Sequence, residues 1–483
     1  MIRSLAIVAV LSIACSRNPA TGRLQFGLPT NDEEIGLGRE AEAQVAAEMP
    51  TYAEVPAATK LVADVGKKIA AKSERPELPW SFTLVDDPAV NAFALPGGFV
   101  YVTRGLLVHL GSEDELAAVL AHEAGHVTAR HGVVQLRKQN AARRSVGLFR
   151  VIDPNLRHVG GIAARTAGLA LLRYSREDEH EADDLAVRYV TDGGWDTAAL
   201  VRVFAVLSSL PTSGEKPPPW LSTHPDPTLR RTRTANSLGI AEAQSPTADP
   251  GYLAALDGVA YGVDPRDGYL IGARFVHPRR GFVLDLPPKW KLLHDREQVL
   301  ALSEDEQAVF IALPTKYENR KAGLTDFFAD GSMTAGAAYD GKVDGFDVAS
   351  RAFAMADEAG NKTMGLVAFI DYEGMVIAMV ALGPAATWLA RADMLAQTFG
   401  SFARIADPRL AGVEPPRIHT IVLDRPSTIE EVQKRPGVVV DAPTLAILNG
   451  VTQTASLPEG WRIKLPQAPS RSPSQSPSQS PSQ

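Results

Sequence analysis

Two histidines and a glutamate stand at a spacing that suits metal chemistry. The stretch from Glu115 to His126 contains the pattern His-Glu-x-x-His, formed by His122, Glu123 and His126. On a helix with 3.6 residues per turn, His122 and His126 project from one face, so both imidazoles can reach one metal ion. Glu123 lies roughly 100° around the helix, where it can reach a metal-bound water. The alternative is an apolar core helix whose histidines are satisfied by hydrogen bonds.

An acidic segment from Tyr174 to Ala186 offers a third ligand. A hydrolytic zinc site needs three protein ligands and an open position for water. We expect Glu179 to be the third ligand. Asp183 follows one helical turn later and could hold the ring N–H of a ligating histidine. The alternative for such a charge cluster is a solvated helix face.

These residues need helices and a small sheet to position them. Ser112 and Glu115 have capping-box spacing, so the first helix is expected to begin there and to continue through the motif to His131. Two more helices are predicted upstream, near residues 31–48 and 57–72, and strands near 80–85 and 99–103. The residues that we expect to form a strand that pairs with an extended peptide are Asn91, Ala92, Gly97, Gly98 and Phe99. A plain hairpin explains the same residues equally well.

Composition excludes some partners and indicates export. The chain has 49 Lys and Arg against 56 Asp and Glu, a net charge of −7 without a long basic run, so nucleic acid is not an expected partner. Residues 1–14 have a positive start and a short apolar run, as in a signal peptide. Cys15, the only cysteine, follows Ala14 as in a bacterial lipobox, although Ser12 departs from that pattern. We expect cleavage before Cys15 and lipid attachment to it, the alternative being an ordinary secreted protein cut nearby.

Several motifs in one order resemble a known family. They are His122 to His126, Ser175 to Asp183, Asn91 to Phe93, Pro96 to Gly98, and Thr223 to Pro225. Together they resemble the zinc metallopeptidases that include the CAAX prenyl endopeptidase and HtpX, in particular their soluble periplasmic, BepA-like lipoprotein branch. The resemblance covers about residues 18–238. It implies one zinc ion per chain on His122, His126 and Glu179, Glu123 as general base, and a Pro96 to Gly98 strand beside the cleft.

The same resemblance places a His-Pro motif and a following arginine near the metal. Two roles are open for them. His224 or Arg230 could stabilise the oxyanion on the scissile carbonyl, or His224 could occupy the open zinc position and hold the enzyme inactive. A proline-rich turn with a loop histidine is the simpler alternative.

The rest of the chain is expected to form accessory units in an α+β protein. After a mainly helical, gluzincin-like peptidase domain with a small sheet (18–240) and a linker (241–250), residues 251–406 are predicted to form a small α+β sandwich. Residues 417–465 follow a strand, helix, helix, strand order and resemble a degenerate LysM module, which would bind peptidoglycan or dock on envelope proteins. Residues 466–483 are expected to form a disordered Ser/Pro/Gln tail.

The expected function is a zinc endopeptidase of the periplasm, anchored by lipid to the outer membrane. The resemblance implies that its substrates are unfolded or misassembled envelope proteins, cut through a metal-activated water with Glu123 as general base. The alternative is a periplasmic chaperone or binding protein whose zinc site is closed by His224.

Overall fold

The computed structural model describes residues 15–26, 28–136, 174–211, 219–241, 248–294, 296, 298–329, 331–356 and 360–469. These residues divide into two compact units. The first unit takes its described residues from 15–136, 174–262 and 416–469, and the second takes them from 263–415. The predicted signal peptide (1–14) and residues 470–483 of the predicted tail lie outside the described part of the chain.

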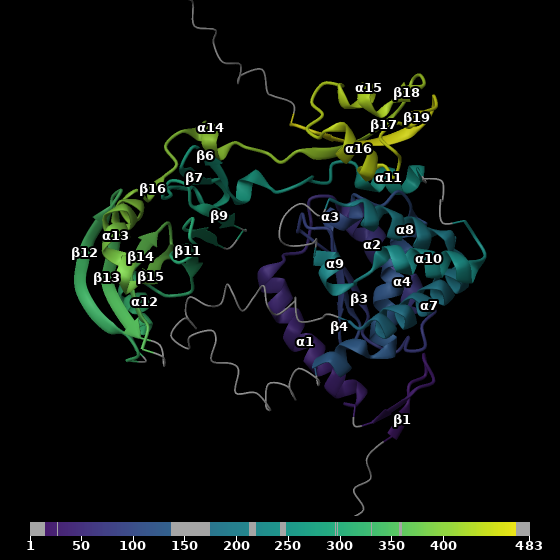
Figure 1. Cartoon of the computed structure of the whole chain (residues 1–483), viewed down its shortest axis with the longest axis horizontal. Coiled ribbons are helices and arrows are strands. Elements are labelled where there is room, and N and C mark those ends of the chain that lie inside the picture. Colours follow the sequence, from purple (N-terminus) through teal and green to yellow (C-terminus); the bar gives the residue numbers. More distant parts are fainter. Residues whose placement is uncertain are drawn as a thin grey trace, which may run out of the picture. The chain divides into compact units, whose positions relative to one another are not determined.

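Helix α4 (Glu113–Ala129) is the centre of the first unit. It packs against α2 (Pro56–Ala70), α7 (Arg176–Gly193) and α8 (Ala198–Ser209), as Figure 1 shows. Every residue of α4 from Glu115 to Ala129 is buried, which removes a large apolar surface from water. Helix α1 (Asn31–Glu48), α9 (Pro219–Thr223) and α10 (Pro227–Leu238) complete the helices around it.

The ends of α4 follow from local sequence. The hydroxyl of Ser112 accepts a hydrogen bond from the Glu115 amide and so caps the helix where predicted. Arg130 has a left-handed backbone with φ 65° and ends the helix after Ala129. The prediction that the helix continues to His131 is therefore wrong, because the chain turns back at Arg130.

A three-stranded sheet lies beside α4, in the order β3 (Ser81–Val85), β5 (Phe99–Thr103), β4 (Ala92–Leu95). Strand β4 is an edge of this sheet, and β5 is its centre. Phe99 pairs with Ser81 on one side and Leu95 on the other, so the prediction that Phe99 offers a free strand edge is wrong. Gly97 and Gly98 form the turn between β4 and β5, with φ of 84° and 100°.

A C-terminal segment belongs to the first unit as well. It contains β17 (Arg417–Val422), β18 (Ser427–Thr428), α15 (Ile429–Gln433), α16 (Ala442–Leu448), β19 (Ser456–Leu457) and β20 (Arg462–Gln467). The predicted strand, helix, helix, strand order is present, with β17 antiparallel to β20. Strand β20 runs to Gln467, which pairs with Arg417, so the start of the tail at residue 466 is wrong.

The division into compact units differs from the predicted linker and accessory boundaries. Helix α11 (Pro250–Leu256) buries Tyr252, Leu253 and Leu256 in the same core as α4. The chain therefore leaves the first unit near Gly262 and returns to it at Pro416. The limits of the sequence modules themselves stay predictions.

The second unit is built on a seven-stranded antiparallel sheet. Its order is β12 (Thr334–Val343), β13 (Phe346–Ala356), β14 (Lys362–Tyr372), β15 (Met375–Pro384), β11 (Val309–Thr315), β10 (Val299–Leu302), β9 (Lys291–His294). Helices α12 (Arg320–Phe327) and α13 (Ala385–Gly400) pack on it, each beside a separate buried cluster. A four-stranded sheet contains β16 (Ala403–Arg404), β8 (Phe282–Asp285), β7 (Arg274–His277) and β6 (Tyr269–Ile271). No helix among the described residues is long and apolar enough to cross a membrane.

Candidate metal centre

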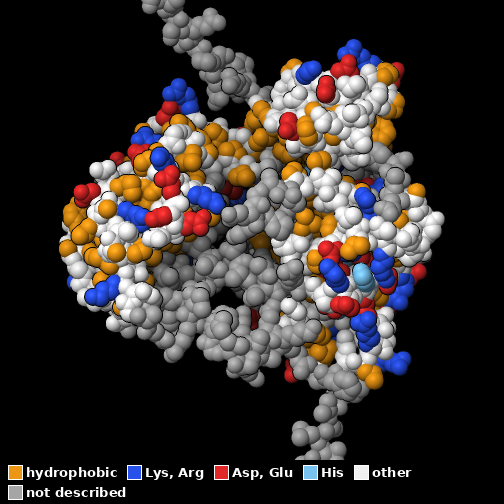
Figure 2. All heavy atoms as spheres, in the orientation of Figure 1, with side chains coloured by type: hydrophobic (Ala, Val, Ile, Leu, Met, Phe, Trp, Pro, Cys, Tyr) orange, Lys and Arg blue, Asp and Glu red, His pale blue; other side chains and the backbone are white. Residues whose placement is uncertain are grey.

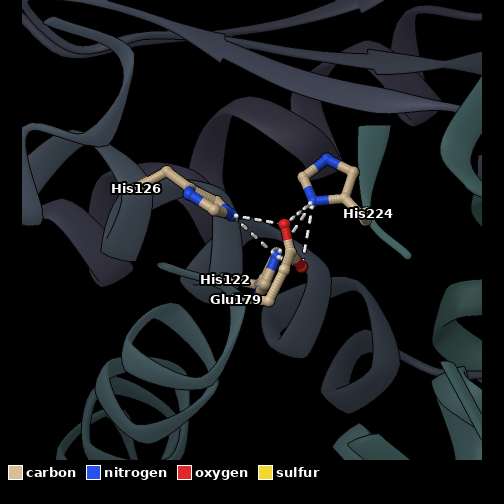
Figure 3. A group of neighbouring side chains, drawn as sticks. All are labelled: His122, His126, Glu179 and His224. Atoms are coloured by element: carbon tan, nitrogen blue, oxygen red, sulfur yellow. Dashed lines mark hydrogen bonds and ion pairs between the residues drawn. The ribbon is translucent and has the colours of Figure 1, made fainter. Parts of the chain in front are cut away.

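Four side chains from three parts of the chain converge in the first unit. They are His122, His126, Glu179 and His224, and one donor atom from each lies within 4.8 Å of the others. Figure 3 shows the two histidines of α4, the carboxylate of α7 and the histidine of the α9–α10 connection pointing toward one another. All four side chains are buried.

The two helix histidines meet as their spacing predicts. Nε2 of His126 lies 3.0 Å from Nε2 of His122, and both nitrogens face Glu179. The carboxylate of Glu179 lies 3.4 Å from His122 and 3.5 Å from His126. Spacing of four residues on a helix therefore places both nitrogens at one point.

Helix α7 approaches α4 closely enough to deliver Glu179. Ser175 and Asp178 form a capping box that starts α7. A Cβ on Gly125 would lie 3.0 Å from the Ala182 carbonyl oxygen, so only a small residue fits between the two helices. The Glu179 pKa falls well below its usual value, since His224 and Arg230 outweigh the effect of burial.

The outer face of α7 has a different character. Asp184 pairs with Arg233 of α10 at 2.7 Å, and Figure 2 shows acidic and basic side chains gathered over these two helices. The solvated acidic face that we considered as the alternative for this segment is therefore present, but on one side of α7 alone. Glu179 and Asp183 lie on the buried side.

His224 lies with the other donors and not in a surface loop. Its Nδ1 is 3.0 Å from Oε1 of Glu179 and 3.3 Å from Nε2 of His122. The Trp220 ring stacks on the His224 ring with centroids 4.2 Å apart. Asp226 has a left-handed backbone with φ 60° just before α10, and this turn brings His224 back toward α4.

Asp183 and Arg230 support the donors from behind. Oδ1 of Asp183 lies 3.0 Å from Nδ1 of His122, the nitrogen that faces away from His126. Arg230 donates to Asp183 through Nε and Nη2, at 2.9 and 2.6 Å, and its Nη1 lies 2.7 Å from Glu179. The buried guanidinium therefore balances two carboxylates, and it lowers the pKa of Asp183 against the effect of burial.

Glu123 is completely buried, and neither of its carboxylate oxygens forms a hydrogen bond with the described residues. Nε2 of His224 is 3.6 Å from its Oε1. Burial raises the pKa of Glu123 above its usual value. A buried carboxylate without a partner is costly, and such groups mark functional sites when they lie beside a cluster of metal donors.

Imidazole nitrogens and a carboxylate are among the donors that bind zinc in proteins, and a set of two histidines and one glutamate is found in catalytic zinc sites. The Glu123 oxygens, which form no hydrogen bond with the described residues, lie beside these donors, as a group that acts on a water would require. The residues present therefore fit a zinc ion. His122, His126 and Glu179 would hold it, with His224 in reach of the same point.

Tyr174 and Trp220 were not assigned to the site from the sequence, and His131 was interpreted as either a surface residue or one that supports a metal ligand. Tyr174 stacks on His126 with centroids 3.9 Å apart, Trp220 stacks on His224, and Nδ1 of His131 lies 2.9 Å from Nδ1 of His126. Trp220 precedes His224 by four residues, a spacing that could have indicated the contact. His131 reaches His126 because the helix ends at Ala129, which the sequence pattern did not indicate.

The predicted peptide-binding strand lies near the donors. Ala94, Leu95 and Pro96 share with His126 the lining of a cavity of about 10 Å³. Asn91 and Ala92 lie at the opposite end of β4, beside Val102 and Thr103. Among the described residues, edge strand β4 is therefore a candidate to pair with a peptide next to α4.

Comparison with known proteins identifies similar chains. The sequence profile described as peptidase family M48 matches residues 56–237. A putative beta-barrel assembly-enhancing protease of Vibrio cholerae is 31% identical over 226 residues, which cover 44% of this chain and 46% of that protein. The mitochondrial metalloendopeptidase OMA1 of Schizosaccharomyces pombe is 30% identical over 239 residues, which cover 48% of this chain and 68% of that protein. The chain spans about half the length of the beta-barrel assembly-enhancing proteases of Vibrio cholerae and Yersinia pestis.

Proposed function

Because the chain belongs to peptidase family M48, we propose that it is a zinc-dependent endopeptidase of the cell envelope. The observation that carries this proposal is the position of Glu123, buried without a hydrogen-bond partner beside His122, His126, Glu179 and His224. A purely structural carboxylate would have a partner in such a place.

The roles of the residues follow from their chemistry. A bound zinc ion would polarise the scissile carbonyl and lower the pKa of a water toward about 7. Glu123 removes a proton from the attacking water and returns it to the nitrogen of the leaving amine. Its raised pKa suits this exchange, because a base that is too weakly basic would not hold the proton between the two transfers. Asp183 orients His122 by accepting from its outer ring nitrogen.

Edge strand β4 is proposed to bind the substrate backbone. An extended peptide added to Ala92–Leu95 would form main-chain hydrogen bonds that require no particular side chains. Asn91, Gly97 and Gly98 flank this strand and would shape its two ends. Such binding suits unfolded segments of many sequences, because an unfolded segment can become extended and its backbone N–H and C=O groups are not yet paired.

The proposed substrates are unfolded or misassembled envelope proteins. This rests on the similarity to proteins described as beta-barrel assembly-enhancing proteases. We propose that the protein acts in the periplasm and is held at the outer membrane by lipid on Cys15, because residues 1–15 have the pattern of an export signal followed by a lipid-modified cysteine. The LysM-like segment is proposed to contact peptidoglycan or envelope proteins.

Glu123→Gln tests the peptidase assignment. The variant is expected to keep its fold and its zinc, and to cleave casein about 10² to 10⁴ times more slowly, the range that a general base contributes. Glu177→Gln is the matched control, because Glu177 is an exposed acid on α7. Full activity of Glu123→Gln would contradict the proposal.

A closed zinc site is the second candidate, favoured by the place of His224 among the donors. In that case the protein would act as a chaperone or binding protein with little peptidase activity. Zinc content and casein cleavage of the wild type and of His224→Ala distinguish the two. Faster cleavage by the variant identifies His224 as a block on the site, and slower cleavage assigns it to the oxyanion. Bound zinc without cleavage in either protein favours the chaperone.

A further inference from the structure

Lys464 of strand β20 is buried against the segment that leads into α4. Its side chain is 1% exposed, and Nζ donates hydrogen bonds to the carbonyl oxygens of Val108 and Leu110, at 2.8 and 2.6 Å. These two carbonyls belong to the connection between α3 (Arg104–Leu107) and the Ser112 cap of α4. A residue more than 350 positions away in sequence therefore anchors the start of the helix that carries His122.

The side chain of Lys464 points to the opposite face of β20 from the side chains of Ile463 and Leu465. Ile463 and Leu465 lie in the core of the C-terminal segment, together with Leu445 and Ile429. Side chains alternate along a strand, so Lys464 leaves this core and enters the peptidase side. A buried lysine is costly unless its donors are satisfied, and an apolar residue at this position would dock more cheaply. The lysine therefore performs a task that an apolar contact would not.

The first turn of α4 is held from several sides. Glu115 accepts from the Gly111 amide at 2.7 Å, and Arg202 of α8 donates to its other oxygen at 3.2 Å. Asp249, the cap of α11, donates its amide to the Gly111 carbonyl at 3.1 Å and accepts from the Glu113 amide at 3.3 Å. Through its hydrogen bonds to Val108 and Leu110, Lys464 adds a contact from the C-terminal segment to this set.

Independent contacts fix the C-terminal segment to the same unit. The backbone of Ile418 exchanges hydrogen bonds with Gly258 and Val259, both at 2.8 Å, in the chain that follows α11. Ile418 and Leu448 lie in the buried cluster that contains the apolar residues of α4. Figure 1 shows α11 between the C-terminal strands and the helices around α4. Lys464 is thus part of a packed interface and not a chance surface contact.

We propose that Lys464 is a positioning residue of the active site, through which the C-terminal segment 416–468 sets the orientation of α4. This rests on the proposed peptidase function. The segment is then a part of the peptidase itself, in addition to any partner that it binds. His122 follows Glu115 by seven residues, about 10 Å along a stiff helix, so a shift at the first turn moves both zinc-binding histidines. A displacement of about 1 Å at a catalytic group can reduce the rate about 100-fold.

Lys464→Met in the full-length chain tests this inference, with Lys434→Met as control for an exposed lysine of the same segment. Hydrogen exchange is measured by mass spectrometry, together with casein cleavage under conditions where each variant is folded. Lys464→Met is expected to raise exchange at residues 108–118 at least fivefold and to lower kcat about tenfold, with KM within twofold of wild type. The control is expected to match the wild type. A loss of overall stability alone would raise exchange throughout the first unit and would not separate kcat from KM.

Unchanged exchange at 108–118, or unchanged kcat, in a folded Lys464→Met protein would overturn the inference. If that variant does not fold, Glu115→Gln is measured instead, because coupling between two sites acts in both directions. Faster exchange in β17 and β20 then supports the inference, and unchanged exchange there overturns it. Exchange requires no peptidase activity, so this result stays separate from the test of Glu123.

Discussion

The buried Glu34 and the partly buried Arg130 form an ion pair in which Oε2 of Glu34 lies 2.6 Å from Nη2 of Arg130. Glu34 is on α1, and Arg130 is the residue that ends α4. Arg75 donates to both oxygens of the same carboxylate, at 3.0 and 2.9 Å, and the Gly97 amide donates to Oε1 at 3.3 Å. One carboxylate therefore joins the end of α4 to the turn that follows edge strand β4.

Glu34→Ala is expected to destabilise the protein by about 3–5 kcal/mol, because it leaves the buried Arg75 guanidinium and the partly buried Arg130 guanidinium without their carboxylate. Urea unfolding followed by circular dichroism measures this change. Glu40→Ala, at an exposed position of the same helix, is expected to change the free energy of unfolding by less than about 0.5 kcal/mol. Equal effects of the two substitutions would show that the buried pair adds no net stability.

Glu179→Ala should lose most of its zinc, since the carboxylate lies within 3.5 Å of both histidines of α4. Metal analysis of the purified protein, before and after dialysis against a chelator, measures the loss. Glu177→Ala removes an exposed acid from the same helix and is expected to retain one zinc per chain. A full zinc load on Glu179→Ala would mean that another residue is the third ligand.

Asp183→Asn is expected to weaken zinc binding about 10- to 100-fold, because an amide orients and polarises His122 less well than a carboxylate. Competition with a chromogenic chelator gives the affinity. Asp184→Asn, which changes the neighbouring exposed acid, should leave it unchanged. At saturating zinc the Asp183→Asn protein should recover much of its activity. If the variant bound zinc as tightly as the wild type, the role of Asp183 would be its ion pair with Arg230 and not the orientation of His122.

Stability should depend on pH through Lys464. Burial lowers the pKa of this lysine to about 7, although the nearby Glu115 carboxylate favours its charged form. Between pH 7 and about 10.5 the unfolded chain then holds a proton that the folded chain lacks, so this group makes the protein more stable as pH rises. Its contribution to stability is lost progressively as pH falls from about 10.5 to about 7.

Comparison of the wild type with Lys464→Met measures this effect together with the accompanying change at Glu115, whose pKa the lysine lowers. Urea unfolding between pH 7 and 9 should show a slope of unfolding free energy that is more positive in the wild type, by at most about 1.4 kcal/mol per pH unit. The other titratable or charged groups nearby are Glu115, His109, Arg202 and Asp249. Burial lowers the pKa of His109 to about 4, so this histidine does not titrate in the window. Burial raises the pKa of Glu115, whose stabilising effect is lost as pH rises through its folded pKa. Equal slopes in the two proteins would contradict the shifted lysine pKa.

Local sequence patterns predicted many of the helices and strands around the site. Ser112 marked the start of α4 because a capping hydroxyl acts within three residues, and the strand at 99–103 appeared where β-branched and aromatic residues cluster. The order of strands in the small sheet was not readable in this way. Whether Phe99 is at an edge or at the centre depends on which strands pair, and this is a contact between distant segments.

The sequence by itself determined that His122 and His126 share a helix face, because the helical repeat is a local property. It also indicated which later acids and which histidine were candidates for the same site. Only the tertiary structure decided that Glu179 and His224 reach the same point, that Glu123 forms no hydrogen bond with the described residues, and that Lys464 anchors the start of α4. These relationships depend on how helices and strands pack across hundreds of residues. Packing selects among many arrangements that have the same local pattern.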